Sequence, residues 1–477
     1  MPVSQLKVSP ARAISRMNGQ IAGQSAGVAS LISMRPIMTP FCGHRPAATV
    51  GIMATYRQPG TRVTERTFTV PLDHAQPGGP AIELFAREVV AADHRASDLP
   101  WLLYLQGGPG IYAPRPSGEP WLARALKDYR VLLLDQRGTG RSTPANRKTL
   151  APLTAQQQAD YLALFRADSI VADAELIRPG LTGGQPWSVL GQSFGGFCTV
   201  SYLSFAPAGM REAFMSGGLP GLGTHADDVY RATYPIVAAR NYAHYRRYPQ
   251  DVAQVRRVAA CLAGSDVRLP NGARLTVEAF QAVGPMLGAA FGSHQLHYLL
   301  ENPFAGAQLT DEFLYKVQEH LTFAAVPLYA VVHEACYAQG APTAWAADRI
   351  RAEFPEFDGA AALASDAPVL FTGEMIYPWM FDLDPVLQPL KEAAELLAQR
   401  GSWPRLYDEA QLRANEVPAA AAVYYDDMYV PLVYSQQTAA AIGGLRPWIT
   451  NEYEHDGLRV SESRVLDRLI ALARGHL

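Results

Sequence analysis

The sequence lacks long apolar runs, blocks of one charge and internal repeats. No stretch of 18 consecutive apolar residues occurs, so a membrane-spanning helix is not expected. The 41 Lys and Arg residues nearly balance the 44 Asp and Glu residues, and no basic stripe stands out. Nucleic acid and anionic membranes are therefore not expected as main partners. Without a repeat at a fixed period, a repeat architecture is not expected either.

Cysteine is also scarce, with four among 477 residues. No two of them stand in a C-x-x-C spacing, a pattern typical of zinc and dithiol sites. We expect reduced, mostly buried thiols and a cytoplasmic location. The four are Cys42, Cys198, Cys261 and Cys336.

Acidic residues are absent from the first 64 positions, which carry Lys7 and six arginines. An organelle transit peptide has a similar composition, but the apolar stretch A-G-V-A-S-L-I-S-M is too short for a secretory signal. We favour a disordered leader over residues 1–62, or translation recorded upstream of a natural start at Met53. From Glu65 onward the composition is that of an ordinary globular protein.

Short apolar runs then predict a series of strands. F-T-V-P-L-D-H (68–74) and I-E-L-F-A-R-E-V-V (82–90) flank a Q-P-G-G-P turn, which predicts an antiparallel pair. The later runs do not alternate with polar residues, so both of their faces are expected to be covered by helices. Helical stretches between them predict a doubly wound α/β domain. These runs are W-L-L-Y-L-Q (101–106), R-V-L-L-L-D (130–135), W-S-V-L-G-Q (187–192) and A-F-M-S (213–216).

The alternation of strands and helices stops after this series. From about residue 224 to 400 aromatic residues recur at helical spacing, and strand patterns return only at 419–425 and 446–453. One α/β core interrupted by a large helical insertion, a cap, explains this order. The expected division is 63–222 for the first part of the core, 223–400 for the cap and 401–477 for the second part of the core.

The run 187–192 ends at Ser193 within G-Q-S-F-G-G, where a strand gives way to a helix. This is the context of a nucleophile elbow, in which a sharp turn exposes a serine hydroxyl. Gly191, Gly195 and Gly196 leave room for the close backbone approach that such a turn requires. A serine in an ordinary tight turn is the alternative, and the choice depends on whether an acid and a histidine follow.

Both partners follow in the order that such folds use, acid before histidine. V-Y-Y-D-D-M-Y-V-P supplies Asp426 and Asp427 at the end of a strand. N-E-Y-E-H-D-G supplies His455 after the last strand and before the final helix. A Ser-His-Asp triad with Ser193 as nucleophile is therefore predicted.

A glycine-rich loop, Q-G-G-P-G (106–110), follows the strand at 101–106. Acyl transfer needs backbone N–H groups that face the developing oxyanion, and small residues let them approach. The candidate donors are Gly107 or Gly108 together with the N–H group of Phe194. A simple turn is the alternative for this loop.

Three motifs together resemble the proline iminopeptidase branch of the α/β-hydrolases: Q-G-G-P-G (106–110), D-Q-R-G-T-G-R-S (135–142) and G-Q-S-F-G-G (191–196). D-D-M-Y-V-P and E-H-D-G-L-R match the ends of the triad in longer members. The similarity covers about residue 63 to the C-terminus. It implies an α/β-hydrolase core with a helical cap, and release of an N-terminal residue, preferably proline, from small peptides without a metal or another cofactor.

The resemblance also refines two positions. Family members place a proline four residues after the catalytic acid, so Pro431 points to Asp427, with Asp426 as the fallback. Gln106 stands where family members often have histidine, which leaves the backbone donors in place but alters the hydrogen bonds around them. Arg137 and Arg141 are expected to hold their loop by pairing with nearby acids.

An aminopeptidase also needs carboxylates that meet the cationic amine of its substrate. Related enzymes present glutamates from the cap, and here V-H-E-A-C-Y and T-G-E-M-I-Y-P-W-M-F offer Glu334 and Glu374 in apolar surroundings. Internal salt bridges are the alternative for both glutamates. Tyr377 and Trp379 are candidates for a pocket around the pyrrolidine ring, with ordinary core packing as their alternative.

The expected partner is a small peptide with a free N-terminus. Three other activities stay open: an aminopeptidase of broader specificity that includes tripeptidyl release, an esterase of the same fold, and a binding protein with an inactive site. The preferred residue, the peptide length and the oligomeric state do not follow from the sequence.

Overall fold

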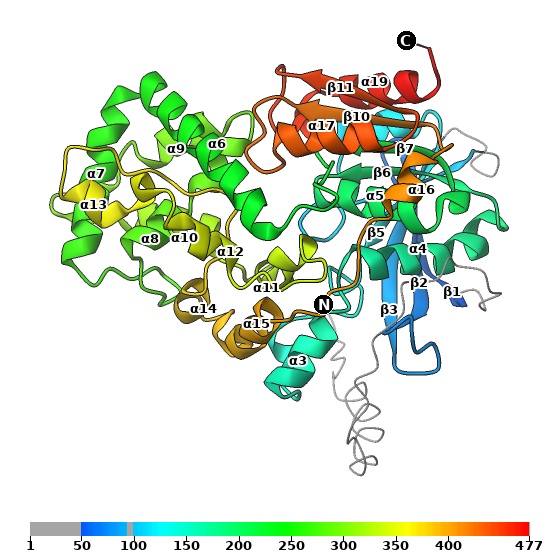
Figure 1. Ribbon diagram of the computed structural model, residues 1–477, viewed down its shortest axis with the longest axis horizontal. Helices are drawn as coiled ribbons and strands as arrows, with labels where there is room; N and C mark the ends of the chain where they lie inside the picture. Colours follow the sequence, from blue (N-terminus) through cyan, green and yellow to red (C-terminus); the bar gives the residue numbers. More distant parts are fainter. Residues whose placement is uncertain (1–48, 93–98, 477) are drawn as a thin grey trace, which may run out of the picture. The chain divides into compact units, whose positions relative to one another are not determined.

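The structure, a computed structural model, describes residues 49–92 and 99–476. Its centre is a nine-stranded sheet in the order β1-β2-β3-β5-β4-β6-β7-β10-β11 (Figure 1). Within the described residues, no helix combines the length and the apolar character needed to cross a lipid bilayer. The strands are β1 Thr49–Gln58, β2 Thr61–Pro71, β3 Ala81–Ala91, β4 Trp101–Leu105, β5 Arg130–Asp135, β6 Trp187–Gln192, β7 Met210–Ser216, β10 Ala419–Tyr424 and β11 Leu445–Thr450.

The first three strands are antiparallel, as predicted for the pair around the Q-P-G-G-P turn. β1 and the first residues of β2 fall within 1–62, where a leader was expected, and β1 includes Met53. β1 was not predicted because it is an edge strand whose apolar side chains do not alternate into a core. Ile52 is 65% exposed. Residues 1–48, with Cys42, lie outside the described residues.

The other six strands run parallel to one another, and β3 pairs antiparallel with β5. Every residue of β4, β6 and β10 is buried, which confirms that helices cover both faces. One face packs against α4 (Ala167–Thr182) and α5 (Phe194–Phe205). The other packs against α1 (Pro120–Ala125) and α19 (Arg464–Ala473). The doubly wound α/β architecture is thus confirmed.

Residues 217–418, which connect β7 to β10, are here called the cap segment. Apart from the two-residue strands β8 (Phe304–Ala305) and β9 (Gln308–Leu309), its described elements are helical. Its helices are α6 Ala226–Arg247, α7 Pro249–Gly264, α8 Val277–Gln281, α9 Gly292–Leu299, α10 Asp311–Leu321, α11 Pro327–Val332, α12 Ala346–Arg351, α13 Gly359–Leu363, α14 Met380–Leu383, α15 Lys391–Ala398 and α16 Glu409–Arg413. They gather apart from the sheet, except α16, which lies beside α5 (Figure 1).

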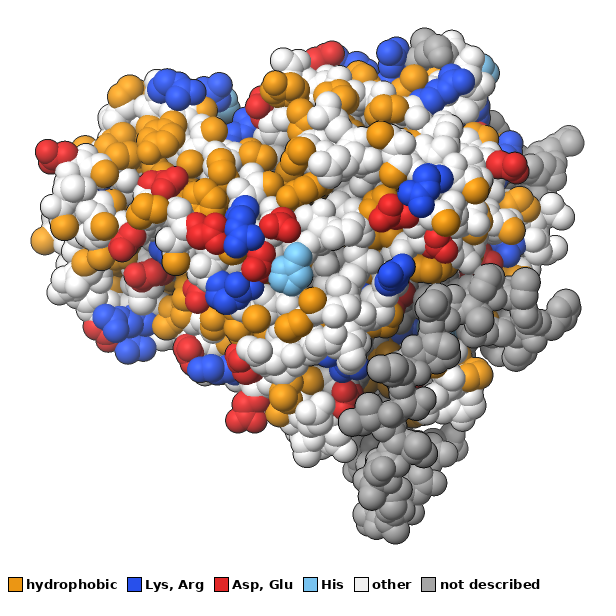
Figure 2. Space-filling view, viewed as in Figure 1, with side chains coloured by type: hydrophobic (Ala, Val, Ile, Leu, Met, Phe, Trp, Pro, Cys, Tyr) orange, Lys and Arg blue, Asp and Glu red, His pale blue; other side chains and the backbone are white. Residues whose placement is uncertain are grey.

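The remaining helices are short or lie around the sheet. They are α2 Arg147–Leu150, α3 Ala155–Leu162, α17 Leu432–Ala441 and α18 Gly457–Val460. On the face seen in Figure 2, acidic and basic side chains are interspersed. Arg231, for example, pairs with both Asp228 and Glu353. This mixture agrees with the nearly balanced composition.

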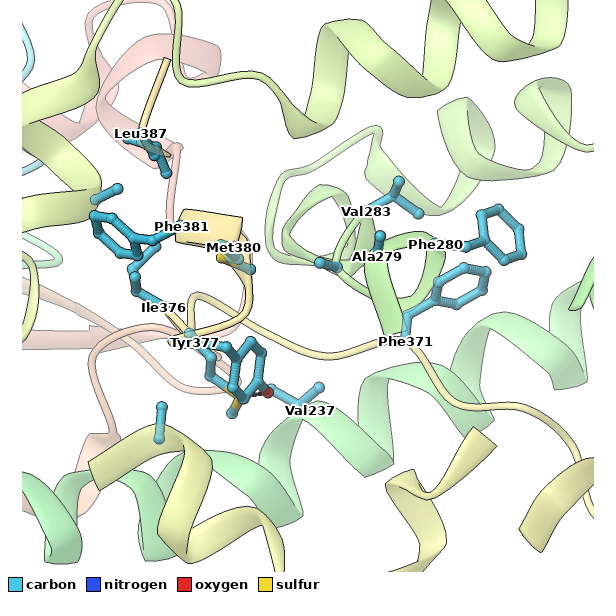
Figure 3. Packing of buried hydrophobic residues seen from close by; sticks show 14 of the residues in the cluster. Val237, Ala279, Phe280, Val283, Phe371, Ile376, Tyr377, Met380, Phe381 and Leu387 are labelled. Atoms are coloured by element: carbon cyan, nitrogen blue, oxygen red, sulfur yellow. Dashed lines mark hydrogen bonds between the residues drawn. The ribbon is translucent and has the colours of Figure 1, made fainter. Parts of the chain in front are cut away.

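The cap segment has an apolar core of its own, in which aromatic side chains from distant parts of the chain meet. Phe280 of α8 lies edge-on against Phe371, with ring centroids 5.4 Å apart. Tyr377 lies on the same irregular stretch as Phe371, and Phe381 lies in α14 directly after it (Figure 3). Many of the aromatic residues that recur at helical spacing in the sequence therefore pack in the core of the cap segment.

One stretch of the cap segment, residues 366–379, forms neither a helix nor a strand. Its buried backbone groups are paired instead with two amide side chains. Asn241 of α6 accepts from Phe371 N at 2.7 Å and donates to Phe371 O at 2.8 Å. The side chain of Gln281 in α8 donates to Leu370 O at 2.7 Å, and the backbone carbonyl of Gln281 accepts from Thr372 N at 2.8 Å. This stretch carries Glu374, so two helices determine where that carboxylate lies.

Candidate active site

Ser193 occupies the turn between β6 and α5, as predicted. Its φ of 55° and ψ of −125° lie in a region that non-glycine residues rarely adopt. Backbone strain of this kind at a strand-to-helix turn is the signature of a nucleophile elbow. The neighbouring glycines are required, because a Cβ on Gly195 would overlap the carbonyl oxygen of Leu105 and one on Gly196 would overlap Gly218.

The glycine-rich loop after β4 lies directly against the serine. A Cβ on Gly107 would come within 2.8 Å of Ser193 Cβ and 2.7 Å of Gln192 Oε1. The N–H group of Phe194 is in the first turn of α5, where a helix leaves such groups without intrahelical partners. The loop and the start of α5 therefore both lie beside Ser193, which is the place where acyl transfer needs oxyanion donors.

The hydrogen bonds of Gln106 hold the same loop. Tyr104 Oη donates to Gln106 Oε1 at 3.0 Å, and Gln136 Nε2 donates to Gln106 O at 3.1 Å. The side chain of Gln106 is thus bonded to Tyr104, on the strand that precedes the loop. At the far end of the loop, a Cβ on Gly110 would meet Tyr329 N of α11 at 2.6 Å, so the cap segment rests on this loop.

The two consecutive aspartates differ sharply in their surroundings. Asp427 is 2% exposed, and its Oδ2 lies 2.7 Å from His455 Nδ1. Its Oδ1 accepts from the N–H groups of Tyr429 at 2.8 Å and Val430 at 3.0 Å. Asp426 is exposed, and it meets Arg240 through its backbone carbonyl. The geometry therefore favours Asp427 over Asp426 as the partner of the histidine.

His455 follows β11 and contacts residues of both the cap segment and the core. Its N–H group donates to Gly288 O of the cap segment at 3.3 Å, and its ring lies 4.6 Å from that of Tyr429. Burial acts to lower the pKa of His455, but the Asp427 carboxylate outweighs it, with a smaller contribution from Glu374. The net effect is a raised pKa, since nearby negative charge favours the imidazolium form.

Two glycines after β7 link the serine and the histidine. A Cβ on Gly217 would touch the His455 ring at 3.2 Å, and one on Gly218 would overlap Ser193 O. Ser193 N also donates to Ser216 O at 2.9 Å. Because these adjacent glycines touch both residues, Ser193 and His455 lie close together at the carboxyl ends of β6 and β7.

The arginines of D-Q-R-G-T-G-R-S pair with acids, as predicted. Arg137 is buried and forms two bonds to Asp173, from Nη2 at 2.6 Å and from Nε at 2.7 Å. Arg141 pairs with Glu65 at 2.7 Å. These pairs fix the loop after β5 and contribute no group to the reaction site.

The two candidate glutamates of the cap segment have different hydrogen-bond partners in the structure. Glu374 Oε1 accepts a hydrogen bond from Tyr329 Oη at 2.6 Å, and its charge reaches His455. Glu334 instead accepts from the N–H groups of Ala346 at 3.1 Å and Ala347 at 2.9 Å, at the start of α12. Glu334 therefore serves a helix terminus, whereas Glu374 is available to a cation.

The two candidate aromatics are separated as well. Tyr377 is fully buried, and its hydroxyl lies 3.0 Å from that of Tyr234 within the apolar core. Trp379 lines a cavity together with Glu374. Core packing therefore describes Tyr377, while Trp379 stays a candidate for contact with a ligand.

Sequence reasoning missed three groups beside the reaction site. Tyr429 stands in D-D-M-Y-V-P, two residues after the acid, and donates to Pro285 O of the cap segment. Tyr329 holds Glu374. Gly217 belongs to an S-G-G-L-P turn after β7, whose adjacent glycines were a usable signal. Neither tyrosine stands in a pattern that indicates a role without the fold.

Two comparisons with known proteins bear on this arrangement. A profile of the α/β hydrolase fold matches residues 100–457. The proline iminopeptidase of Aeromonas sobria is 54% identical over 409 residues, which cover 85% of this chain and 95% of that protein. Proline iminopeptidase aneH of Aspergillus aculeatus is 38% identical, over 86% of this chain and 93% of that protein.

Among solved structures, a proline iminopeptidase-related protein from Thermus thermophilus aligns over 86% of this chain and 97% of its own. It has 16% identity and a TM-score of 0.34. The fold and the strained serine turn define an α/β hydrolase. The chain belongs to the α/β-hydrolase fold family and, within it, to the family of the proline iminopeptidases.

Proposed function

We propose that the protein is a prolyl aminopeptidase that releases N-terminal proline from small peptides through an acyl-enzyme on Ser193. Membership of the proline iminopeptidase family supports the activity. The observation that carries the mechanism is the ordered set of a strained serine, a buried Asp427–His455 pair and a glycine loop beside the serine. This set is what covalent acyl transfer by a serine requires.

In the proposed mechanism, His455 takes the proton of Ser193 Oγ as that oxygen attacks the substrate carbonyl. Asp427 holds the imidazole through Nδ1 and stabilises the imidazolium that forms. The N–H groups of Phe194 and of Gly107 or Gly108 bind the oxyanion. His455 then protonates the leaving amine, and water, activated by the same histidine, hydrolyses the ester.

Selection for a free N-terminus is assigned to Glu374. Its carboxylate lies near His455 and has one hydrogen bond from Tyr329 in the structure, so it can still accept from an ammonium group. An anchored amine would fix the distance from the N-terminus to the scissile carbonyl at one residue. Glu334, committed to α12, would support the wall of the site without contacting the amine.

The domain division is part of the proposal: residues 63–222 and 401–477 form the catalytic core and residues 223–400 form the cap. The strands of the large sheet lie outside the cap range, which supports this division. A cytoplasmic location is also proposed. Cys198, Cys261 and Cys336 are free thiols, as expected in a reducing compartment.

The test is a panel of aminoacyl-β-naphthylamides with the wild type and Ser193→Ala. We expect proline to rank first in kcat/KM, and Ser193→Ala to lose at least about 10⁴-fold in kcat. Ser201→Ala, in the same helix, is the control that should stay close to the wild type. Preferred cleavage of a simple ester or of a tripeptidyl amide would contradict the proposal, as would full turnover by Ser193→Ala.

A further inference from the structure

The cap segment contains a cavity of about 200 Å³, and the proposed mechanism uses only Glu374 of the residues that line it. Its inner end is formed by Glu374, Tyr329 and Pro285, and its outer end by Asn271, Arg274 and His320. The outer residues are exposed on the surface, whereas Gly373, beside Glu374, is buried. The cavity therefore runs from the surface of the cap segment to the carboxylate assigned to the substrate amine.

We propose that this cavity is the exit passage for the released amino acid and its transient binding site. The inference rests on the proposed function, because it concerns the second product of the acyl-enzyme reaction. In that reaction the shortened peptide leaves first, and hydrolysis then frees the N-terminal residue with its amine still on Glu374. The freed amino acid thus starts at the inner end of the cavity.

Tyr429 contacts both the reaction site and the inner end of the cavity. Tyr429 lies 4.6 Å, between ring centroids, from His455 on one side. On the other side its hydroxyl donates to Pro285 O, and Pro285 lines the cavity. Glu374 lines the cavity, and its negative charge also contributes to the raised pKa of His455. The cavity and the reaction site are therefore neighbours on both sides of Tyr429.

The size of the cavity decides between a peptide and a single amino acid. Pockets for drug-sized ligands occupy about 300–1,000 Å³, whereas a cavity of about 150 Å³ can hold a benzene-sized molecule. About 200 Å³ therefore suits one amino acid with a five-membered ring. A peptide substrate would not fit, so the occupant is the product.

The walls match the chemistry of a small apolar amino acid. Ala279 and Ala282 leave the passage open on one side, and Ile376 and Met380 lie across from Ala279 (Figure 3). The indole N–H group of Trp379 is buried and has no partner among the described residues, although Trp379 lines the cavity. An amino-acid carboxylate would accept from this donor, since a buried donor without a partner is costly.

The outer end carries a positive side chain that would attract the same carboxylate. Arg274 is 52% exposed and pairs with Asp266 only at 3.4 Å. Asp384 also lines the cavity, and its carboxylate accepts from the backbone N–H groups of Phe323 at 3.1 Å and Val386 at 2.8 Å. The exposed guanidinium group of Arg274 is therefore the group at this end that can bind an amino-acid carboxylate on its way out.

The experiment narrows the passage from two opposite walls with Ala279→Phe and Leu383→Trp. Stopped-flow measurements with proline β-naphthylamide follow naphthylamine, the first product. If proline leaves through the cavity, each variant releases a burst of one naphthylamine per enzyme and then turns over about tenfold more slowly in kcat. kcat/KM should stay within about twofold of the wild type, because it reports only the steps through acylation.

Ala360→Phe on α13 makes the same change at an exposed site outside the cavity and should leave both constants unchanged. A fall in kcat/KM for both narrowing variants would make the cavity an entrance or a substrate subsite, and unchanged kcat would make it unused space. Either result overturns the exit passage. Both leave the proposed function intact, since that fails only if the wild type does not prefer proline or Ser193→Ala remains active.

Discussion

The α/β core and the cap segment fix their functional groups by different means. In the core, Ser193, Asp427 and His455 each follow a parallel strand of one sheet, so the backbone brings them to one edge. In the cap segment, Glu374 lies on an irregular stretch held by the side chains of Asn241 and Gln281. A backbone-defined site can be predicted from chain order, whereas a site held by side chains cannot.

The largest expected effect tests the core. Asp427→Asn should lower kcat by about 10⁴-fold, because it removes the charge that orients and stabilises the His455 imidazolium. Asp426→Asn alters an exposed side chain and should stay within about twofold of the wild type. The measurement is steady-state kinetics on proline β-naphthylamide. Equal losses of kcat in the two variants would contradict the assignment of Asp427, and not Asp426, as the partner of His455.

The next effect tests the cap segment. Glu374→Gln should lower kcat/KM for a free-amine substrate by about 10²-fold, since a charge-assisted bond to the ammonium group is lost. Glu334→Gln should keep kcat/KM within about threefold but destabilise the fold by about 1 kcal/mol, because the start of α12 loses an anionic acceptor.

Thermal unfolding and kinetics on both variants separate these outcomes. If Glu334→Gln matched the kinetic loss of Glu374→Gln, Glu334 would be an amine ligand and its bonds to Ala346 and Ala347 would not define its role. The two glutamates would then act as a pair, as the sequence first suggested.

The smallest expected effect tests whether the negative charge of Glu374, in the cap segment, raises the pKa of His455 in the core. His455 must be neutral to act as a base, so its raised pKa places the acid limb of kcat/KM above the pH expected of an ordinary imidazole. Glu374→Gln removes one cause of the increase, and the limb should move to lower pH. Asp426→Asn should leave the limb unchanged. A shift to higher pH in Glu374→Gln would contradict the electrostatic link.

The same contrast explains what the sequence could predict. The strand at 187–192 has the bounds of β6, and the order of Ser193, Asp427 and His455 along the chain follows from the topology of the sheet. The edge strand β1 was missed because its pairing with β2, not a buried face, holds it in place. Tyr329 and Tyr429 were missed because their partners, Glu374 and Pro285, are far away in sequence.

Glu334 and Glu374 illustrate the limit most clearly. Both stand in apolar sequence surroundings, so the sequence predicts the same role for both. Only the folded chain places the N–H groups of α12 at Glu334 and leaves Glu374 beside the reaction site. Hydrogen bonds between distant segments decided their roles, and a local pattern does not encode such bonds.

The stretch that carries Glu374 has a consequence for the evolution of specificity. Asn241 and Gln281 lie on different helices and hold the backbone of this stretch. Under the proposed function, they would thereby set the distance from the amine ligand to the nucleophile and limit release to one residue. A lineage that altered either amide could lengthen that distance and release longer acyl groups, with every residue of the reaction site still in place.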